Sequence, residues 1–196
     1  MIADFARSVV SSYLMPRRTL RVVLSRGLGP QDVALLLLLG YVIAEILSIL
    51  VPGARPENGS GVSRHVLGLA SAFASLFLFA WPIYGIGRMF GGTGDLLQTC
   101  VMWCWFSLVM SFVSVPALPA MLEVFATLQK GPPSEETAQA LQGSMAVIFI
   151  MAAIWFWMLG NFVTELHGFR SVIATTACMF GIMLFVALFF MVMAGG

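Results

Sequence analysis

The sequence predicts an all-α polytopic membrane protein with five transmembrane helices and an N-terminal amphipathic helix at the membrane interface. Five stretches are mainly apolar and long enough to cross a bilayer, which takes about 20 helical residues. Hydrophobic residues make up 60% of the 196-residue chain, while only 10% of its residues are charged. A soluble domain carries about 25% charged residues. The apolar runs do not alternate with polar residues, and this excludes the strands of a membrane barrel.

Residues 1–30 form the predicted amphipathic basic segment. Ile2, Phe5, Val9 and Tyr13 recur at near-helical spacing with polar residues between them, which favours a helix lying on the membrane surface. Pro16 is expected to break that helix. Four arginines follow closely and are expected to contact anionic lipid head groups: Arg17, Arg18, Arg21 and Arg26. No stacking aromatic residues are interleaved with these arginines, so the segment does not indicate binding of nucleic acid.

Residues 31–196 form the predicted five-helix transmembrane domain. Its spans are expected at about 31–51, 66–87, 96–116, 144–163 and 172–193. Pro116 and Pro119 lie in the third apolar run, where each removes one helical hydrogen bond. We expect the third helix to end near Pro116. The alternative is a helix that bends there and continues along the membrane surface to Glu123.

The distribution of cations predicts the orientation of these five spans. Seven of the ten Lys and Arg residues fall on the side of the membrane that holds the N-terminus. Loops that stay in the cytoplasm carry the excess of Lys and Arg. The N-terminus is therefore predicted to be cytoplasmic, and the C-terminus is predicted to lie on the opposite side.

Glu45 is the one ionisable residue well inside a predicted span. An unpaired charge at the centre of a membrane helix costs about 2.5–3.5 kcal/mol on insertion scales. The carboxyl group could belong to a proton relay or an ion site. It could also be neutral and hydrogen-bonded to Ser48, Tyr41 or a neighbouring span. We favour the structural role, because no second buried acid, lysine or histidine accompanies Glu45.

A glycine-rich segment, residues 84–95, joins the second and third spans. Five glycines surround Arg88, including Gly91 and Gly92, and Asp95 ends the segment. The spacing only approximates the dinucleotide-binding motif, which in any case requires a preceding strand. The segment instead predicts a tight cytoplasmic turn that uses the conformational freedom of glycine. Asp95 is expected to cap the third helix, and Arg88 is expected to reach lipid phosphate.

Glu165 and His167 lie in a short cytoplasmic turn before the last span. The turn is either a simple interfacial connection, which we favour, or half of a surface that binds a partner. The two histidines, His65 and His167, are predicted on opposite faces of the membrane, so they cannot share a metal or a haem. The chain has no HExxH or CxxC motif and no aspartate pair. We therefore predict no cofactor, no metal and no enzymatic activity.

The layout resembles the Yip domain family of five-span membrane proteins, in its bacterial form. The basic segment with Pro16, the glycine-rich turn at residues 84–94 and the turn at residues 165–169 carry the resemblance. The resemblance implies an integral protein of the bacterial inner membrane without an established activity, and it supplies no catalytic residues. The Asp-Leu-Tyr-Gly-Pro signature of eukaryotic members is absent, so a role with Rab GTPases is not implied.

Two functional hypotheses follow. The first is a non-enzymatic accessory, assembly or stabilising subunit of a membrane complex, or a membrane organiser, that acts through helix–helix contacts. Its expected partners are membrane lipids and other integral subunits or further copies of the chain. The alternative is a small oligomeric transporter or channel that uses Glu45.

Overall fold

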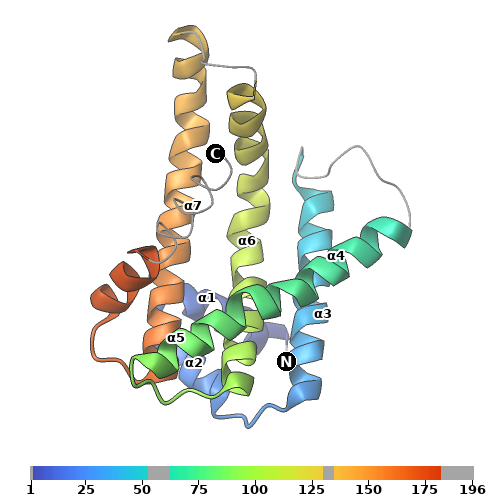
Figure 1. Ribbon diagram of the computed structural model, residues 1–196. Helices are drawn as coiled ribbons and strands as arrows, with labels where there is room; N and C mark the ends of the chain where they lie inside the picture. Colours follow the sequence, from blue (N-terminus) through green and yellow to red (C-terminus); the bar gives the residue numbers. More distant parts are fainter. Residues whose placement is uncertain (1, 53–61, 130–134, 182–196) are drawn as a thin grey trace, which may run out of the picture.

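The computed structural model describes residues 2–52, 62–129 and 135–181, and within these ranges the chain is all-helical, with no strand (Figure 1). The predicted all-α class is confirmed. The helices are α1 (Ile2–Leu14), α2 (Pro16–Leu24), α3 (Pro30–Leu50), α4 (Val62–Ser75), the π-helical turn η1 (Leu76–Ala80), α5 (Trp81–Met89), α6 (Leu96–Leu128) and α7 (Glu135–His167). A shorter apolar helix, Val172–Gly181, follows α7.

Four of the described helices are long and apolar enough to cross a membrane. They cover Pro30–Leu50, His65–Met89, Leu96–Thr127 and Leu141–His167, and each overlaps one of the first four predicted spans. The second of them combines α4, η1 and α5 into one rod, which runs obliquely across the other helices in Figure 1. The fifth predicted span is described only as far as Gly181, and the remainder of residues 172–193 lies outside the described ranges. The total of five spans stays a prediction.

The core of the bundle lies around the first half of α6. Residues from Val101 to Met110 contribute nine of its twenty buried hydrophobic residues, among them Phe106 and Leu108. Helices α3 and α7 pack on either side of α6. Phe106 meets Trp155 and Phe162 of α7 in edge-to-face contacts, with ring centroids 5.4 and 6.2 Å apart. Such aromatic pairs add about 0.5–1.5 kcal/mol each beyond the burial of their surface.

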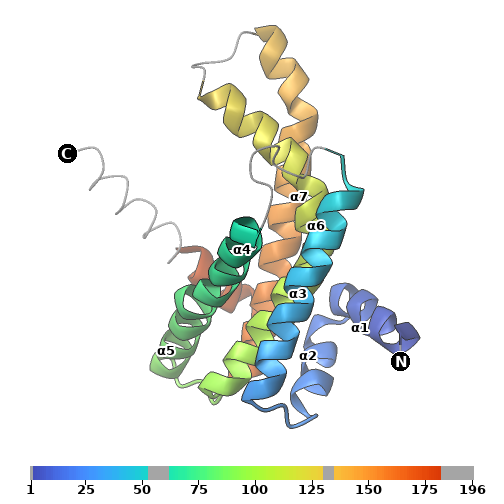
Figure 2. The ribbon, with the colours of Figure 1, turned by 90° about the vertical axis from the view of Figure 1, so that its right-hand side faces the viewer.

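The expected end of the third helix near Pro116 is wrong. Helix α6 continues through Pro116 and Pro119 to Leu128. Membrane helices tolerate proline when neighbouring structure supports the interrupted turn. The second half of α6 has this support, because Ala117 is buried and the Ser144 hydroxyl of α7 donates a hydrogen bond to the Glu123 carboxylate. Figure 2 shows this half inclined to the first, as expected of a proline bend.

The N-terminal helices pack on the bundle. Helix α1 ends at Leu14 and α2 begins with Pro16, at the break that the proline predicts. The Trp105 indole N–H of α6 donates to the Ser12 hydroxyl at 3.1 Å, and the Tyr13 hydroxyl donates to the Val109 carbonyl. Burial raises the pKa of Tyr13 to about 12. These bonds hold α1 against α6, where a simple surface helix would contact lipid alone.

Candidate functional site

The structure gathers most of the predicted site residues at one end of the bundle. The glycine-rich turn between α5 and α6, the last turn of α7 and one face of α2 meet there. We call this region the turn cluster and define it by Arg17, Arg21, the segment 87–95, Glu165 and His167. Glu45 lies elsewhere, on α3.

His167 is the centre of the turn cluster. It is the last residue of α7 and only 2% exposed. A Cβ atom added to Gly87 would lie 2.1 Å from its Nε2 atom, and one added to Gly92 would lie 2.5 Å from its Nδ1 atom. Real Cβ atoms essentially never approach so closely, so only glycine leaves room for the ring. The Phe169 ring stacks on the imidazole, with centroids 5.5 Å apart.

Backbone hydrogen bonds fix the glycine-rich turn against α7. The Thr93 N–H donates to the His167 carbonyl at 3.2 Å, and the Gly92 N–H donates to the Gly87 carbonyl at 2.8 Å. Gly91 has φ +77°, a left-handed conformation that glycine adopts without steric cost. The Arg88 guanidinium donates to the Gly92 carbonyl at 3.2 Å. The loop that joins α5 to α6 is thus tied to the end of α7.

Asp95 begins α6 as its cap. Its carboxylate accepts from the Gln98 N–H at 2.7 Å, while the Gln98 side chain accepts from the Asp95 N–H at 3.3 Å. This reciprocal pair satisfies two donors that the first helical turn leaves without partners. The Asp95 carbonyl also accepts from the buried Thr99 hydroxyl at 2.7 Å. Asp95 therefore has the capping role that its position before the apolar run predicts.

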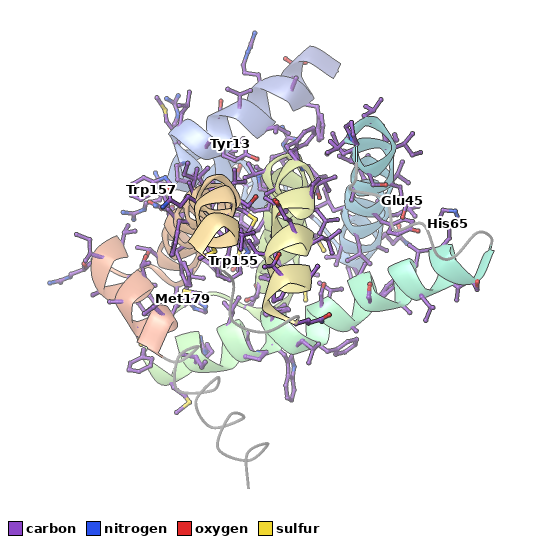
Figure 3. The ribbon with its side chains drawn as sticks, turned by 90° about the horizontal axis from the view of Figure 1, so that it is seen from above. Tyr13, Glu45, His65, Trp155, Trp157 and Met179 are labelled. Carbon is purple, nitrogen blue, oxygen red and sulfur yellow. The ribbon has the colours of Figure 1, made fainter. Side chains whose placement is uncertain are left out.

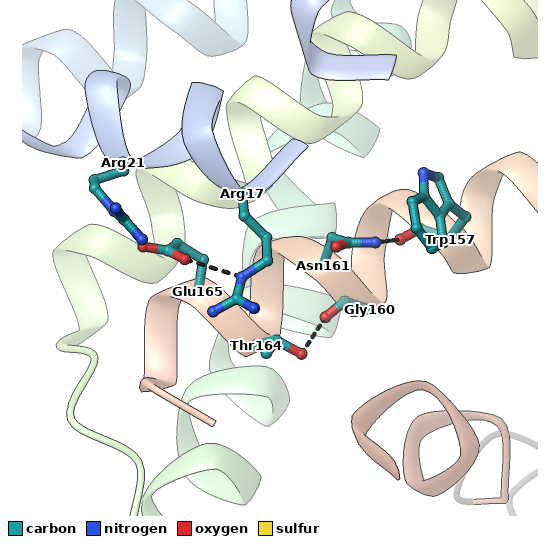
Figure 4. A network of polar contacts seen from close by, with 7 residues as sticks. All are labelled: Arg17, Arg21, Trp157, Gly160, Asn161, Thr164 and Glu165. Atoms are coloured by element: carbon teal, nitrogen blue, oxygen red, sulfur yellow. Dashed lines mark hydrogen bonds and ion pairs between the residues drawn. The ribbon is translucent and has the colours of Figure 1, made fainter. Parts of the chain in front are cut away.

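Glu165 joins α7 to the basic helix α2 (Figure 4). Its two carboxylate oxygens accept from the Nε atoms of Arg17 at 3.0 Å and Arg21 at 2.7 Å. The two arginines are four residues apart, which places them on the same face of α2. The Glu165 side chain is only 11% exposed, so the carboxylate is more shielded from water than an ordinary surface acid. The structure therefore uses two of the four predicted lipid-binding arginines inside the chain.

The other two predicted lipid-binding arginines, Arg18 and Arg26, are exposed. Arg18 follows Arg17 in α2, and Arg26 lies in the turn that follows α2. Their contact with lipid head groups stays a prediction, as does the contact of Arg88 with lipid phosphate.

Buried polar side chains of α7 bond to their own helix next to the turn cluster. The Asn161 amide donates to the Trp157 carbonyl at 2.7 Å, and the Thr164 hydroxyl donates to the Gly160 carbonyl at 2.6 Å (Figure 4). Gly160 also permits a close crossing, because a Cβ atom there would lie 1.9 Å from the Thr176 hydroxyl oxygen. The helix Val172–Gly181 thus packs close to α7, as small residues allow in membrane proteins.

Glu45 is half-buried on α3, and His65 lies near the start of α4 (Figure 3). The Ser48 hydroxyl, an expected partner of its carboxyl, donates instead to the Glu45 backbone carbonyl at 2.8 Å. The Tyr41 hydroxyl and His65 Nδ1 share a hydrogen bond of 2.9 Å. Among the described residues no three His, Cys, Asp or Glu side chains gather closely enough to hold a metal ion.

The family of the chain follows from its match to a known domain. The family model of the Yip1 domain matches residues 10–194, which is nearly the whole sequence. The chain belongs to the Yip1 domain family. No curated protein and no solved structure matched it. The Yip1 match and the apolar helices together show a membrane protein with transmembrane helices. The matched range includes α2 and the whole turn cluster, so these features lie within the Yip1 domain.

Sequence reasoning missed how the parts of the turn cluster fit together. Gly87 and Gly92 were visible as members of a turn, but their contact with His167, about 80 residues later in the chain, was not. The pairing of Glu165 with α2 was missed for the same reason. One signal was available: Arg17 and Arg21 share a helical face, and Glu165 is a lone acid beside a predicted cytoplasmic turn.

Proposed function

We propose that this Yip1 domain protein is a non-enzymatic accessory, assembly or stabilising subunit of a membrane complex, or a membrane organiser, that acts through helix–helix contacts. The main support for the proposal is that the chain itself covers only a small part of the surface of its apolar helices. In the most apolar 18-residue stretch of His65–Met89, only 6% of the residues are buried within the chain. In that of Pro30–Leu50, 11% are buried. Exposed faces of this kind are available to lipid or to the helices of another subunit.

The turn cluster supports the proposal in a second way. Its two carboxylates already serve the fold, because Asp95 caps α6 and Glu165 pairs with α2, while the His167 ring fills the space beside Gly87 and Gly92. Groups used in this way hold α2, the glycine-rich turn and the end of α7 together. A rigid end with a basic helix on its side is suited to positioning other membrane components.

Purification from native membranes tests the proposal. The tagged protein is extracted in a mild detergent, captured, separated on a native gel and analysed by mass spectrometry. We expect a stoichiometric complex with another integral subunit, and we expect the abundance of this protein to fall when that subunit is deleted. A lone monomer, together with unchanged abundance and gel migration in every deletion strain, would contradict the proposal.

The proposed location is the bacterial inner membrane, with the N-terminus in the cytoplasm and the C-terminus in the periplasm. The turn cluster gathers Arg17, Arg21 and Arg88 at one end of the bundle, and such basic ends are retained in the cytoplasm. Fusions of an alkaline phosphatase reporter to each terminus test the orientation. Activity is expected from the C-terminal fusion alone, and activity from the N-terminal fusion would contradict the orientation.

One observation favours the alternative of a small oligomeric transporter that uses Glu45. A cavity of about 280 Å³ lies between α3, α4 and α6, and hydroxyl groups line part of it, among them Tyr41, Ser71 and Ser107. Ala44, which precedes Glu45, lies on its wall, whereas Glu45 itself is not among the described residues that line it. Under this alternative, Glu45→Gln abolishes proton-coupled solute flux into liposomes and leaves the helical content unchanged. Equal flux in the two proteins would exclude a role for the carboxylate.

A further inference from the structure

A second and larger cavity lies between α5, α7 and the helix Val172–Gly181. Its volume is about 790 Å³, within the range of roughly 300–1,000 Å³ typical of ligand sites. The lining is mostly apolar and includes Leu78 and Ile86 of the oblique rod together with Trp155 and Met179. Trp155 of α7 and Met179 of the last described helix, both labelled in Figure 3, line the same cavity.

The polar groups of this cavity lie at one end. Arg170 and Ser171 line it just beyond the end of α7, and Thr175 follows one turn later. No carboxylate is among the described residues that line the cavity, so Arg170 gives this end a net positive charge. An occupant with a negative group at one end and a long apolar body has the matching polarity.

The length of the cavity points to the same kind of occupant. Its walls include Leu78 at one extreme and Phe90 at the other, twelve residues apart along the oblique rod. At 1.5 Å per residue this distance is about 18 Å. One leaflet contributes half of the roughly 30 Å hydrocarbon core, or about 15 Å. An acyl chain that extends from the membrane interface to the middle of the bilayer is therefore similar in length to this cavity wall.

We propose that this cavity binds an anionic phospholipid, with its phosphate at Arg170 and an acyl chain along Ile86, Trp155 and Leu78. Basic pockets between membrane helices are known to hold anionic lipid head groups. The site is separate from the predicted head-group contacts of the N-terminal arginines, because it lies between α5 and α7 and holds the acyl chain as well. The bound lipid would stabilise the packing of the helix Val172–Gly181 against α7.

Fluorescence quenching by brominated lipids tests the proposal. The full-length protein is reconstituted in phosphatidylcholine vesicles that contain increasing fractions of phosphatidylglycerol with brominated acyl chains. A parallel series contains brominated phosphatidylcholine. We expect one component of the tryptophan quenching to appear at an about fivefold lower mole fraction of the anionic lipid than of phosphatidylcholine. This ratio corresponds to the attraction between one arginine and one negatively charged lipid. Trp155→Phe should remove this component, whereas Trp157→Phe, which changes an exposed residue outside the lining, should keep it.

Two further variants test the head-group contact. Arg170→Gln should abolish the fivefold preference, and Arg7→Gln, which removes an exposed cation of α1, should preserve it. Circular dichroism of each variant confirms the helical content. Equal quenching by the two lipids, or a low-fraction component that survives Trp155→Phe, would overturn the proposal. So would a Trp155 signal that no brominated lipid reaches, which would mean that the cavity is filled by protein, from a second copy or from the rest of the chain.

Discussion

Single glycines determine the geometry of the turn cluster. Gly87 and Gly92 lie against the ring of His167, whereas a Cβ atom added to Gly85 would meet nothing within 4 Å beyond its own helix. Both Gly85 and Gly87 belong to α5, and alanine would favour the helix at each. The two positions therefore have the same helical backbone but different surroundings. This makes them a matched pair for substitution.

Gly87→Ala is expected to destabilise the protein by about 1–3 kcal/mol, because the new methyl group must displace the buried His167 ring. Gly85→Ala is expected to be neutral or slightly stabilising. Unfolding of the purified protein in detergent, followed by circular dichroism, measures both changes. The double variant Gly87→Ala/His167→Ala should lose less than the sum of its two single changes. Equal stability of the two single glycine variants would show that the His167 ring does not restrict the side chain at position 87.

Helix α2 is attached to the bundle by charge as well as by apolar contact. Leu20 and Val23 are buried, while Arg17 and Arg21 reach Glu165 from the same helix. Arg21 is 71% exposed and Arg17 41%, so solvent screens both ion pairs. Exposed ion pairs contribute about 0.2–1 kcal/mol each. The apolar contacts therefore supply most of the attachment, and the ion pairs select the position of α2 on α7.

Glu165→Gln is expected to loosen α2 and to speed the cleavage of the chain by trypsin after Arg18. Cleavage inside a helix requires local opening, and a loss of about 1 kcal/mol raises the open population roughly fivefold. Glu123→Gln provides the matched control, since it removes a carboxylate from the far end of α6. The fragments are followed on gels over time. Identical cleavage rates in the two variants would show that the ion pairs do not hold α2.

The start of helix α6 could be predicted from the sequence, but its end could not. Its apolar run predicted a membrane helix, and Asp95 predicted the start of that helix. The prolines suggested an end that does not occur, because packing against α7 supports the helix beyond Pro116. Local propensity alone does not contain that information, since the supporting residues come from a different part of the chain.

The same limit applies to the whole molecule. Hydropathy and length predicted the four described spans, because a bilayer imposes both on any helix that crosses it. The candidate site was predictable as a set of residues near one membrane face. Its assembly was not, because Glu165 meets Arg17 only once α2 folds back along α7. Contacts between residues so far apart depend on how whole helices are aligned with one another. Local patterns in a single sequence do not reveal that alignment.

Among the four long apolar helices that the structure describes, the oblique rod formed by α4, η1 and α5 is the least buried. Its exposed apolar side chains include Leu67, Phe77 and Trp81, each at least 64% exposed within the chain. A helix covered so little by its own bundle has room for the helix of another subunit. The claim that the protein works through helix–helix contacts therefore depends on what covers these three positions in the native membrane.

Photo-crosslinking in native membranes identifies what covers these positions. A photoreactive amino acid replaces Leu67, Phe77 or Trp81 in turn, and Phe162, which is fully buried inside the chain, provides the control position. We expect a discrete adduct with a second polypeptide from at least one position of the rod and none from position 162. Adducts with lipid alone at all three positions would contradict this expectation.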